Sequence, residues 1–390
     1  MHLTPTSIMS ITATSTEPPP EADFGSKSIG KNLVRPVRMA VVGLGFGLHI
    51  VDNQLICGSG AAWVDLVGVF DLNLELAATV AKARGLVRYE SFDEILRDPT
   101  IETVGIFTPP QGRAELVREA IRAGKHVMTT KPFERNPVEA LDVLEEARAL
   151  GRTVHMNSPS PLPAPETAQF FAWNREFSLG RPISARWETY VHRVQHADGS
   201  WYDDPRRCPA APLFRLGVYG INQLIRVCGR MERVCVAHSR ILTKKPTPDT
   251  AEMLVRFESG AIGSVFASFC VDDGIRYGNN LTVHFEHGTI RSESHRTDAH
   301  FNKAEHVVKL RTVAADGRLV QREAYFPLEA MTGQYHWGEF HAAVRSNGCL
   351  QGEIEPELIA HAVAVIDAMG RSEQSGQWES VEVLACQDSK

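Results

Sequence analysis

The sequence predicts an α/β protein in which a doubly wound parallel sheet is followed by an α+β region with an open, largely antiparallel sheet. From Val37 to Asn157, short apolar runs alternate with amphipathic segments, which is the pattern of parallel strands joined by crossover helices. After Asn157, longer runs with a two-residue alternation follow one another, as is typical of antiparallel strands. A chain of 390 residues exceeds what one core usually fills, so we expect two domains, 37–157 and 158–390.

Helix start and stop signals place the elements of the first domain. Asn73 can cap a helix that Gly85 ends, Ser91 and Glu94 have the spacing of a capping box, and Asn136 precedes a proline at the first position of a helix. The expected strands are 39–42, 64–70, 104–107, 126–130 and 153–156, and the expected helices are 43–57, 73–85, 91 onward, 111–123 and 137–150.

The second domain is expected to hold consecutive strands and two closing helices. Ser259-Gly260 is a hairpin turn signal between two of these strands. The far face of this sheet is apolar enough to meet another subunit, so we expect a homo-oligomer. The expected strands are 183–191, 233–239, 253–258, 261–271, 281–287 and 307–314, and the expected helices are 333–345 and 356–369.

Composition narrows the class of protein. The net charge is −6 and the basic residues are scattered, which argues against nucleic-acid binding. The seven cysteines form no CxxC pair and the histidines form no HxH or HExxH motif, so neither a disulfide framework nor a metal site is expected. No apolar run is long enough to span a membrane, and we expect a cytoplasmic protein. Residues 1–36 are predicted to be a disordered tail, or an arm that lies across a neighbouring subunit.

A glycine-rich turn follows the first strand. Gly43-Leu-Gly45-Phe46-Gly47 leads directly into a helix, and glycines there allow a tight turn and a close approach of the backbone to a pyrophosphate. Leu48 stands where a third glycine is usual, so the motif alone is weak, because such turns also form for packing reasons. The position predicts a Rossmann-like dinucleotide site that includes these three glycines and Phe46.

Two further positions support a dinucleotide. Asp71 ends the second strand, where a carboxylate meets the ribose hydroxyls and repels a 2′-phosphate, so NAD is favoured over NADP. The alternative is a surface aspartate that opens a turn. Thr108-Pro109-Pro110 follows a later strand at the carboxyl edge of the sheet, where open α/β folds bind ligands. We expect Thr108 and Pro109 to contact the cofactor, the alternative being a plain turn.

Lys131 is the first candidate for chemistry. It follows the strand 126–130 and precedes a proline that fixes its direction. A lysine at this edge, beside a nicotinamide, can hydrogen-bond the reacting oxygen and lower the pKa of a partner group. The alternative is a solvated lysine.

These motifs together resemble the N-terminal half of the Gfo/Idh/MocA oxidoreductases. The residues that carry the resemblance are the glycine turn, Asp71, Thr108-Pro109-Pro110, Ala123-Gly-Lys-His-Val127 and Lys131-Pro132. The resemblance covers 37–157 closely and the rest more loosely. It implies an NAD(P)-binding domain joined to an open-faced sheet domain, assembly as dimers or tetramers, and action on sugars, inositols or cyclic diols.

The second family motif departs from its usual form. Members usually have Glu-Lys-Pro and Asp-x-Gly-x-His-x-x-Asp, whereas this chain has Thr130-Lys131-Pro132 and Arg215-Leu-Gly-Val-Tyr219-Gly-Ile-Asn222. Branches similar to glucose–fructose oxidoreductase and dimeric dihydrodiol dehydrogenases also carry the tyrosine. We expect Tyr219 to be the general acid or base, with its pKa lowered by Lys131, and Asn222 to bind substrate. The alternative for Tyr219 is a core residue on a helix face.

Arg215 replaces a carboxylate with a cation. Because guanidinium groups grip carboxylates, Arg215 suggests an anionic substrate such as a sugar acid or a carboxylated cyclic diol, and Arg113 is a further candidate on the same side. The alternative is an arginine paired with Asp203 or Asp204 for structure.

The sequence therefore predicts an NAD-dependent dehydrogenase or reductase acting on CH–OH groups of a small hydroxylated substrate. Two alternatives stay open. One is a transhydrogenating sugar oxidoreductase whose cofactor never leaves, and the other is a cofactor-binding sensor that has lost catalysis.

Overall fold

The computed structural model describes residues 35–275, 277–296, 304–327, 335–346 and 355–382. Most of the expected tail, residues 1–34, and the first residues of the helix expected at 333–345 lie outside this range. The described residues from Pro36 onward form one compact unit. Among them, none of the helices combines the length and the apolar character that crossing a bilayer requires.

The first sheet confirms the expected doubly wound architecture. Its six strands are parallel and run in the order β3-β2-β1-β4-β5-β6, with the reversal of strand order between β1 and β4. The strands are β1 (Val37–Val42), β2 (Val64–Phe70), β3 (Val87–Arg88), β4 (Thr103–Ile106), β5 (His126–Thr129) and β6 (Val154–Met156). Sequence analysis missed β3, because two exposed residues carry no periodic signal.

Capping side chains fix the helices between these strands. The Asn73 side chain accepts a hydrogen bond from the Leu76 amide at 3.1 Å, and Gly85 ends the same helix with a φ of +66°. These helices are α2 (Leu74–Arg84), α3 (Phe92–Arg97), α4 (Arg113–Arg122) and α5 (Pro137–Ala149). The expected capping box before α3 forms only by half. Ser91 caps the Glu94 amide, but the Glu94 carboxylate accepts from the Glu90 amide.

The first helix begins later than expected. Instead of one helix over 43–57, the chain forms the short helix α1 (Phe46–Ile50) and a π-helical segment, Val51–Ile56. Gly43 has a φ of +86°, which is outside the helical region, so the glycines form the turn and the helix starts after them.

The second sheet has nine strands in the order β14-β13-β12-β11-β7-β10-β9-β8-β15. The pairing of β7 with β10 is parallel and the other pairs are antiparallel. The strands are β7 (Pro182–Tyr190), β8 (Met231–Ser239), β9 (Thr250–Phe257), β10 (Ile262–Ser268), β11 (Gly278–Phe285), β12 (Gly288–Arg296), β13 (Ala304–Val313), β14 (Leu319–Pro327) and β15 (Glu379–Ser380). Sequence analysis missed β12, β14 and β15. The edge strand β14 is largely exposed and rich in polar residues, so it lacks a buried apolar face.

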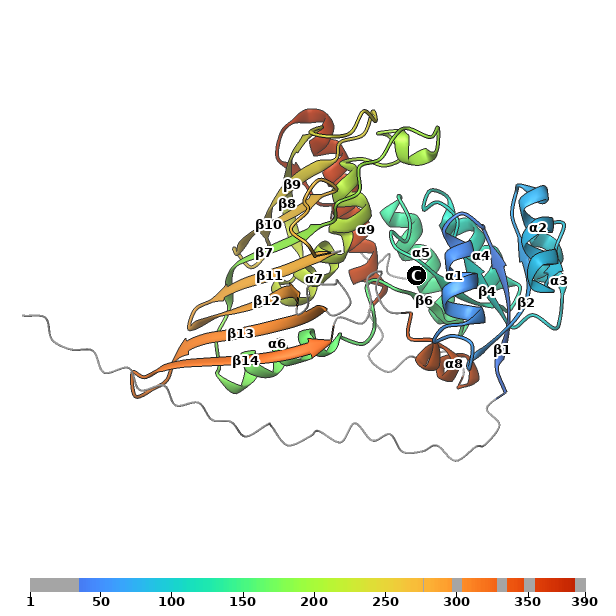
Figure 1. Cartoon of the computed structure of the whole chain (residues 1–390). Coiled ribbons are helices and arrows are strands. Elements are labelled where there is room, and N and C mark those ends of the chain that lie inside the picture. Colours follow the sequence, from blue (N-terminus) through green and yellow to red (C-terminus); the bar gives the residue numbers. More distant parts are fainter. Residues whose placement is uncertain (1–34, 276, 297–303, 328–334, 347–354, 383–390) are drawn as a thin grey trace, which may run out of the picture. The chain divides into compact units, whose positions relative to one another are not determined.

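Helices cover one face of the second sheet (Figure 1). They are α6 (Pro165–Glu176), α7 (Val218–Cys228) and α9 (Pro356–Ser375). The last helix also contributes Ile359, Ala360 and Val363 to the core of the first sheet. The helix α8 (Trp337–Arg345) packs Trp337 and Phe340 against the opposite side of that sheet.

The opposite face of the second sheet exposes apolar side chains. Leu254 on β9 and Ile262 on β10 are 49% and 61% exposed. The register of β9 and β10 places both on the face that points away from Met253 and Val265 in the core. Subunit contact through this sheet stays a prediction, as does the boundary between 37–157 and 158–390.

One close contact fixes α7 against the sheet. A Cβ added to Gly220 would lie 2.2 Å from the Trp187 ring, so only glycine allows the helix to approach the indole at this distance. Tyr219 and Asn222 flank this contact on the same helix.

We expect Gly220→Ala to lower the unfolding midpoint by several degrees, because overpacking a well-filled core costs about 1–3 kcal/mol. Gly370→Ala is the matched control in another helix. Its added Cβ would lie 3.4 Å from Pro209, and alanine is favoured over glycine in a helix by about 1 kcal/mol. Thermal unfolding checks both variants, and an equal midpoint for Gly220→Ala and the parent would contradict the packing argument.

Candidate active site

The glycine turn lies at the carboxyl edge of the first sheet. A Cβ on Gly43 would lie 3.1 Å from the Phe107 carbonyl carbon and the Thr108 amide, so this position requires glycine. Gly45 has no heavy atom within 4 Å of its added Cβ. The helix α1 that follows has no side-chain cap and no acidic residue in its first turn. The turn therefore leaves room and uncapped backbone amides for an anionic group.

The other residues expected at the cofactor lie around this turn. The Asp71 carboxylate accepts hydrogen bonds from the Leu44 amide at 2.6 Å and from the Asn73 amide at 2.8 Å. The Thr108 hydroxyl oxygen is buried without a hydrogen-bond partner among the described residues. Pro109, the next residue, is exposed. These groups line one edge, and an orphaned hydroxyl there fits a polar ligand.

Phe46 packs within the same turn. Its ring lies 6.5 Å from the Phe107 ring in an edge-on contact and is stacked on His49 at 5.7 Å. The side chain is half-buried, so it borders the glycine turn as expected for a cofactor-binding position.

Lys131 and Tyr219 are in contact, although Lys131 follows β5 of the first sheet and Tyr219 lies on α7, which covers the second sheet. The Lys131 ammonium nitrogen lies 4.6 Å from the centroid of the Tyr219 ring and donates a hydrogen bond to the backbone carbonyl of Arg215. The ammonium therefore lies over the ring face and is held by η3 (Leu213–Gly217), the segment that immediately precedes α7. The two predicted catalytic side chains are brought together.

The pKa values of the pair differ from what the sequence suggests. Burial, aided by the charge of Arg215, lowers the pKa of Lys131 to about 7. Burial raises the pKa of Tyr219 well above its ordinary value, against a smaller lowering by the hydrogen bond from Asn157. The expectation that Lys131 lowers the pKa of Tyr219 is wrong in direction, because desolvation of the phenolate outweighs the nearby cation. Tyr219 is thus a neutral phenol near pH 7.

Asn157 joins the two residues, and sequence analysis missed it. Its side-chain carbonyl accepts hydrogen bonds from the Lys131 amide and the Thr130 hydroxyl, both at 3.1 Å. Its amide nitrogen donates to the Tyr219 hydroxyl at 3.3 Å. Tyr335 extends this hydrogen-bond network, because its hydroxyl donates to the Thr130 hydroxyl at 3.2 Å. Asn157 directly follows β6, and this place at the carboxyl edge was the one signal that could have identified it.

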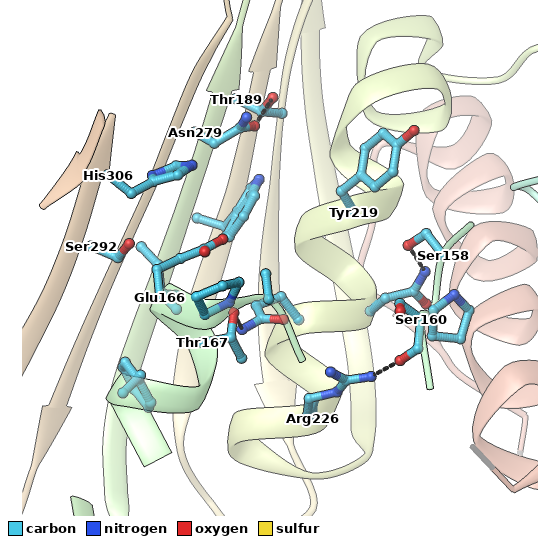
Figure 2. Close-up of a pocket in the computed structure, with 18 of the residues that line it drawn as sticks. Ser158, Ser160, Glu166, Thr167, Thr189, Tyr219, Arg226, Asn279, Ser292 and His306 are labelled. Atoms are coloured by element: carbon cyan, nitrogen blue, oxygen red, sulfur yellow. Dashed lines mark hydrogen bonds between the residues drawn. The ribbon is translucent and has the colours of Figure 1, made fainter. Parts of the chain in front are cut away.

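A cavity of about 230 Å³ opens beside Tyr219 (Figure 2). Tyr219 and Asn222 both line it, and the Asn222 amide nitrogen donates to the Ser158 hydroxyl at 2.9 Å. The cavity lies between α7 and the covered face of the second sheet. Both predicted site residues therefore line one cavity, and their roles toward a substrate stay predictions.

Arg113 lies away from this cavity. It is 1% exposed, and its guanidinium donates to the backbone carbonyls of Thr130 at 2.6 Å and Phe133 at 3.1 Å, and also to those of Thr108 and Pro132. Burial lowers its pKa to about 10. These contacts tie the loops after β4 and β5 together, so Arg113 holds the edge on which Lys131 stands.

Arg215 also lies outside the residues that line the cavity. Its guanidinium lies 4.2 Å from the Tyr202 ring and 4.8 Å from the Phe269 ring, and donates to the Gln195 side chain at 2.6 Å. The alternative pairing with Asp203 or Asp204 is not what holds it. Asp203 pairs with Lys245 at 2.8 Å and Asp204 with Arg206 at 3.6 Å.

Both parts of the chain match known protein families. Residues 37–158 match the model of an oxidoreductase family with an NAD-binding Rossmann fold, and residues 147–291 match the Gfo/Idh/MocA C-terminal domain. The chain belongs to the Gfo/Idh/MocA family. It is an oxidoreductase by this membership, and its first sheet is the NAD-binding Rossmann fold of the family.

Named relatives cover different shares of this Gfo/Idh/MocA chain. A 1,5-anhydro-D-fructose reductase from Ensifer adhaerens is 25% identical over 83% of the chain and 94% of its own length. An uncharacterised oxidoreductase, C115.03, of Schizosaccharomyces pombe is 30% identical, over half of this chain and 52% of its own length. The solved structure of levoglucosan dehydrogenase with NADH and L-sorbose is 19% identical with a TM-score of 0.67, covering 90% of this chain and all of that one. That structural likeness shows the shared fold.

The lowered pKa of Lys131 has a measurable consequence for stability. An unfolded lysine holds its proton to about pH 10.4, whereas the folded one releases it near pH 7. Between these values the unfolded chain binds more protons, so raising the pH stabilises the folded protein. We expect the unfolding free energy of the parent, relative to Lys131→Met, to rise between pH 7 and pH 9 by on the order of 2 kcal/mol.

Denaturant unfolding of both proteins at the two pH values measures this difference. Lys82→Met, on the exposed side of α2, is the matched control and should show no such rise. A flat difference for Lys131→Met would mean that Lys131 remains an ordinary ammonium group.

Proposed function

We propose that the protein is an NAD-dependent dehydrogenase or reductase that transfers a hydride between nicotinamide and a CH–OH or C=O group of a sugar or cyclic polyol. The observation that carries the proposal is the contact of Lys131 with Tyr219, whose side chain lines a cavity that Lys131 itself does not line. A cation and a neutral phenol side by side can bind and polarise one carbonyl or hydroxyl oxygen.

The residues around the glycine turn fit the dinucleotide. Gly43, Gly45 and Gly47 would bring backbone amides to the pyrophosphate, and Asp71 would meet the adenosine ribose. Thr108, whose hydroxyl lacks a partner, would gain one. When bound, the nicotinamide accepts or donates the hydride, and the protein supplies position and electrostatics.

Tyr219 and Lys131 divide the proton chemistry. As a neutral phenol, Tyr219 donates a proton to the substrate oxygen during reduction and is left as a phenolate. Oxidation is the reverse: the phenol must first release its proton, to the Lys131 amine or to solvent, and the phenolate then accepts the proton of the substrate hydroxyl. Because the pKa of Lys131 is about 7, its amine is present in both forms at neutral pH. The ammonium form stabilises negative charge on the phenol or the substrate oxygen. Asn157 keeps the phenol oxygen at a fixed place relative to the lysine backbone.

The substrate class follows from the family and from the cavity. Two of the proteins compared above are a 1,5-anhydro-D-fructose reductase and a levoglucosan dehydrogenase, so both are named for anhydro sugars. The cavity is small and lined by hydroxyl, amide and imidazole groups together with apolar side chains, which is the mixture that a hydroxylated ring needs.

The decisive test is turnover. We expect reduction of NAD, measured at 340 nm, with at least one member of a panel of inositols, aldoses, anhydro sugars and cyclic diols, or oxidation of NADH with the matching ketones. Lys131→Met and Tyr219→Phe should each lower kcat/KM by about 100-fold or more, since general acid–base groups contribute roughly 10²–10⁴. NADH binding, measured by fluorescence, should stay within about threefold of the parent.

Tyr89→Phe is the matched control, because Tyr89 is buried but bonds Asp98 at 2.7 Å on the far edge of the first sheet. It should keep parental turnover. Parental activity of Lys131→Met would move catalysis elsewhere. NADH binding without turnover of any compound would favour a sensor, and nicotinamide that survives extensive dialysis would favour the transhydrogenating alternative.

Asp71 carries the proposed preference for NAD. We expect Asp71→Ser to weaken NADH binding and to lower the ratio of NADH to NADPH affinity by about tenfold, because a carboxylate repels the 2′-phosphate. Asp65→Ser removes an exposed carboxylate on β2 that pairs with Arg38 and should leave this ratio unchanged. Fluorescence titration with both cofactors decides, and an unaltered ratio in Asp71→Ser would exclude this role for the carboxylate.

A further inference from the structure

Two walls of different origin enclose the cavity beside Tyr219. Helix α7 presents Tyr219, Asn222, Gln223 and Arg226, which recur at the three- and four-residue spacing of one helix face. The opposite wall is the covered face of the second sheet. Figure 2 shows His306 and Ser292 on that wall, across the cavity from Tyr219.

The sheet wall carries a polar row where a core face is normally apolar. The strand register places Thr189 of β7, Asn279 of β11, Ser294 of β12 and His306 of β13 side by side across four neighbouring strands. The Thr189 hydroxyl donates to Asn279 at 2.8 Å, and the Ser294 hydroxyl exchanges hydrogen bonds with the Asn279 backbone. His306 ends the row.

Two polar atoms on this wall are buried and have no hydrogen-bond partner among the residues that the structure describes. They are Nε1 of Trp187 and Nδ1 of His306, and both residues line the cavity. His306 is 8% exposed. Buried polar groups in proteins are nearly always hydrogen-bonded, so unpartnered nitrogens on two residues that line the same cavity point to a ligand that would complete them.

The indole is held in place rather than free to turn away. Gly220 of α7 abuts the Trp187 ring, and Leu281 of β11 lies opposite Trp187 in the register. Its N–H is therefore a preorganised donor. Burial lowers the pKa of His306, so the imidazole is neutral and offers one donor and one acceptor.

The charges on the cavity argue against an anionic substrate. Arg226 and Glu166 line it, and the Arg226 guanidinium already donates to the Ser160 carbonyl. Arg215, which suggested a carboxylate in the sequence, lies outside the lining between two aromatic rings. One cation and one carboxylate leave the lining close to neutral, and the described residues that line the cavity offer no second cation for an anionic group.

We propose that Trp187 and His306 form a subsite that binds hydroxyl groups of the substrate remote from the reacting carbon, and that the substrate is an uncharged polyhydroxylated ring. This inference rests on the proposed function, because it names the substrate of that reaction. The indole donates to one hydroxyl oxygen, and the imidazole donates to or accepts from a neighbouring hydroxyl. Substrate specificity is thus set by the sheet, and chemistry by α7 and the edge of the first sheet.

Two substitutions test the subsite. Trp187→Phe removes the N–H and keeps an aromatic ring, and His306→Phe removes both nitrogens and keeps a flat ring. Each should raise KM for the best substrate by about tenfold and change kcat by less than about threefold, because the lost contacts do not involve the reacting atoms. His306→Phe should not lower the unfolding midpoint, since it removes an unpaired buried nitrogen.

Trp173→Phe is the matched control. Trp173 is 7% exposed on α6 and does not line the cavity, so this variant can lose stability but should keep the parental KM. If Trp187→Phe and His306→Phe also keep the parental KM, the subsite proposal is wrong. If they lose kcat and KM is unchanged, these residues act in chemistry and the proposal is equally wrong.

A substrate comparison tests the charge. With the parent protein we expect higher kcat/KM for D-glucose, D-galactose or myo-inositol than for the carboxylated ring D-glucuronate, by about tenfold or more. A deoxy sugar that lacks one remote hydroxyl completes a double-mutant cycle, with one change in the protein and one in the substrate. With this deoxy sugar, His306→Phe or Trp187→Phe should lower kcat/KM less than it does with the parent sugar. A preference for D-glucuronate would overturn the inference while confirming the oxidoreductase. Turnover of none of these compounds or of the wider panel would remove the proposed function itself.

Discussion

The geometry of the site depends on the side chain of Asn157. This amide accepts from the Lys131 backbone and the Thr130 hydroxyl and donates to the Tyr219 hydroxyl, so it joins the edge of one sheet to a helix that covers the other. Asn157 is 2% exposed, and a buried amide strongly resists the loss of its partners. A short side chain with few rotamers therefore fixes the distance between two groups that are far apart in the sequence. Arg113 stiffens the same edge by holding the carbonyls of both neighbouring loops.

Much of this arrangement could be predicted from local patterns. The parallel strands and their capped helices follow from apolar periodicity and from Asn73, Gly85 and Asn136. Lys131 and Tyr219 could be found because each lies in a recognisable motif. For Asn157 local patterns contained only its place after β6, because its hydrogen bonds to Thr130, Lys131 and Tyr219 are all long-range. They contained no signal for the exposed edge strand β14. They also assigned Arg113 to the substrate site, because a sequence does not show that its guanidinium is fully hydrogen-bonded to backbone carbonyls.

Charge and burial act on Lys131 in the same direction. In the usual motif a carboxylate stands where this chain has Arg215, and a carboxylate would favour the ammonium form of the lysine. Here the neighbouring cation and the loss of solvent both lower the pKa of Lys131. The phenol of Tyr219 stays neutral for the same reason of burial. Near neutral pH the tyrosine therefore keeps its proton, and the lysine is the member of the pair that gains or loses one.

Helix α9 belongs to two cores at once. Ile359, Ala360 and Val363 pack with the first sheet, whereas Val365 and Ile366 pack with the second. During synthesis from the N-terminus, the first sheet emerges some 200 residues before the helix that completes it. Until α9 is synthesised, part of the apolar surface of the first sheet stays uncovered. The core of this sheet is completed only when α9 packs against it. Folding of the nucleotide-binding half is in this sense a late event, even though that half is made first.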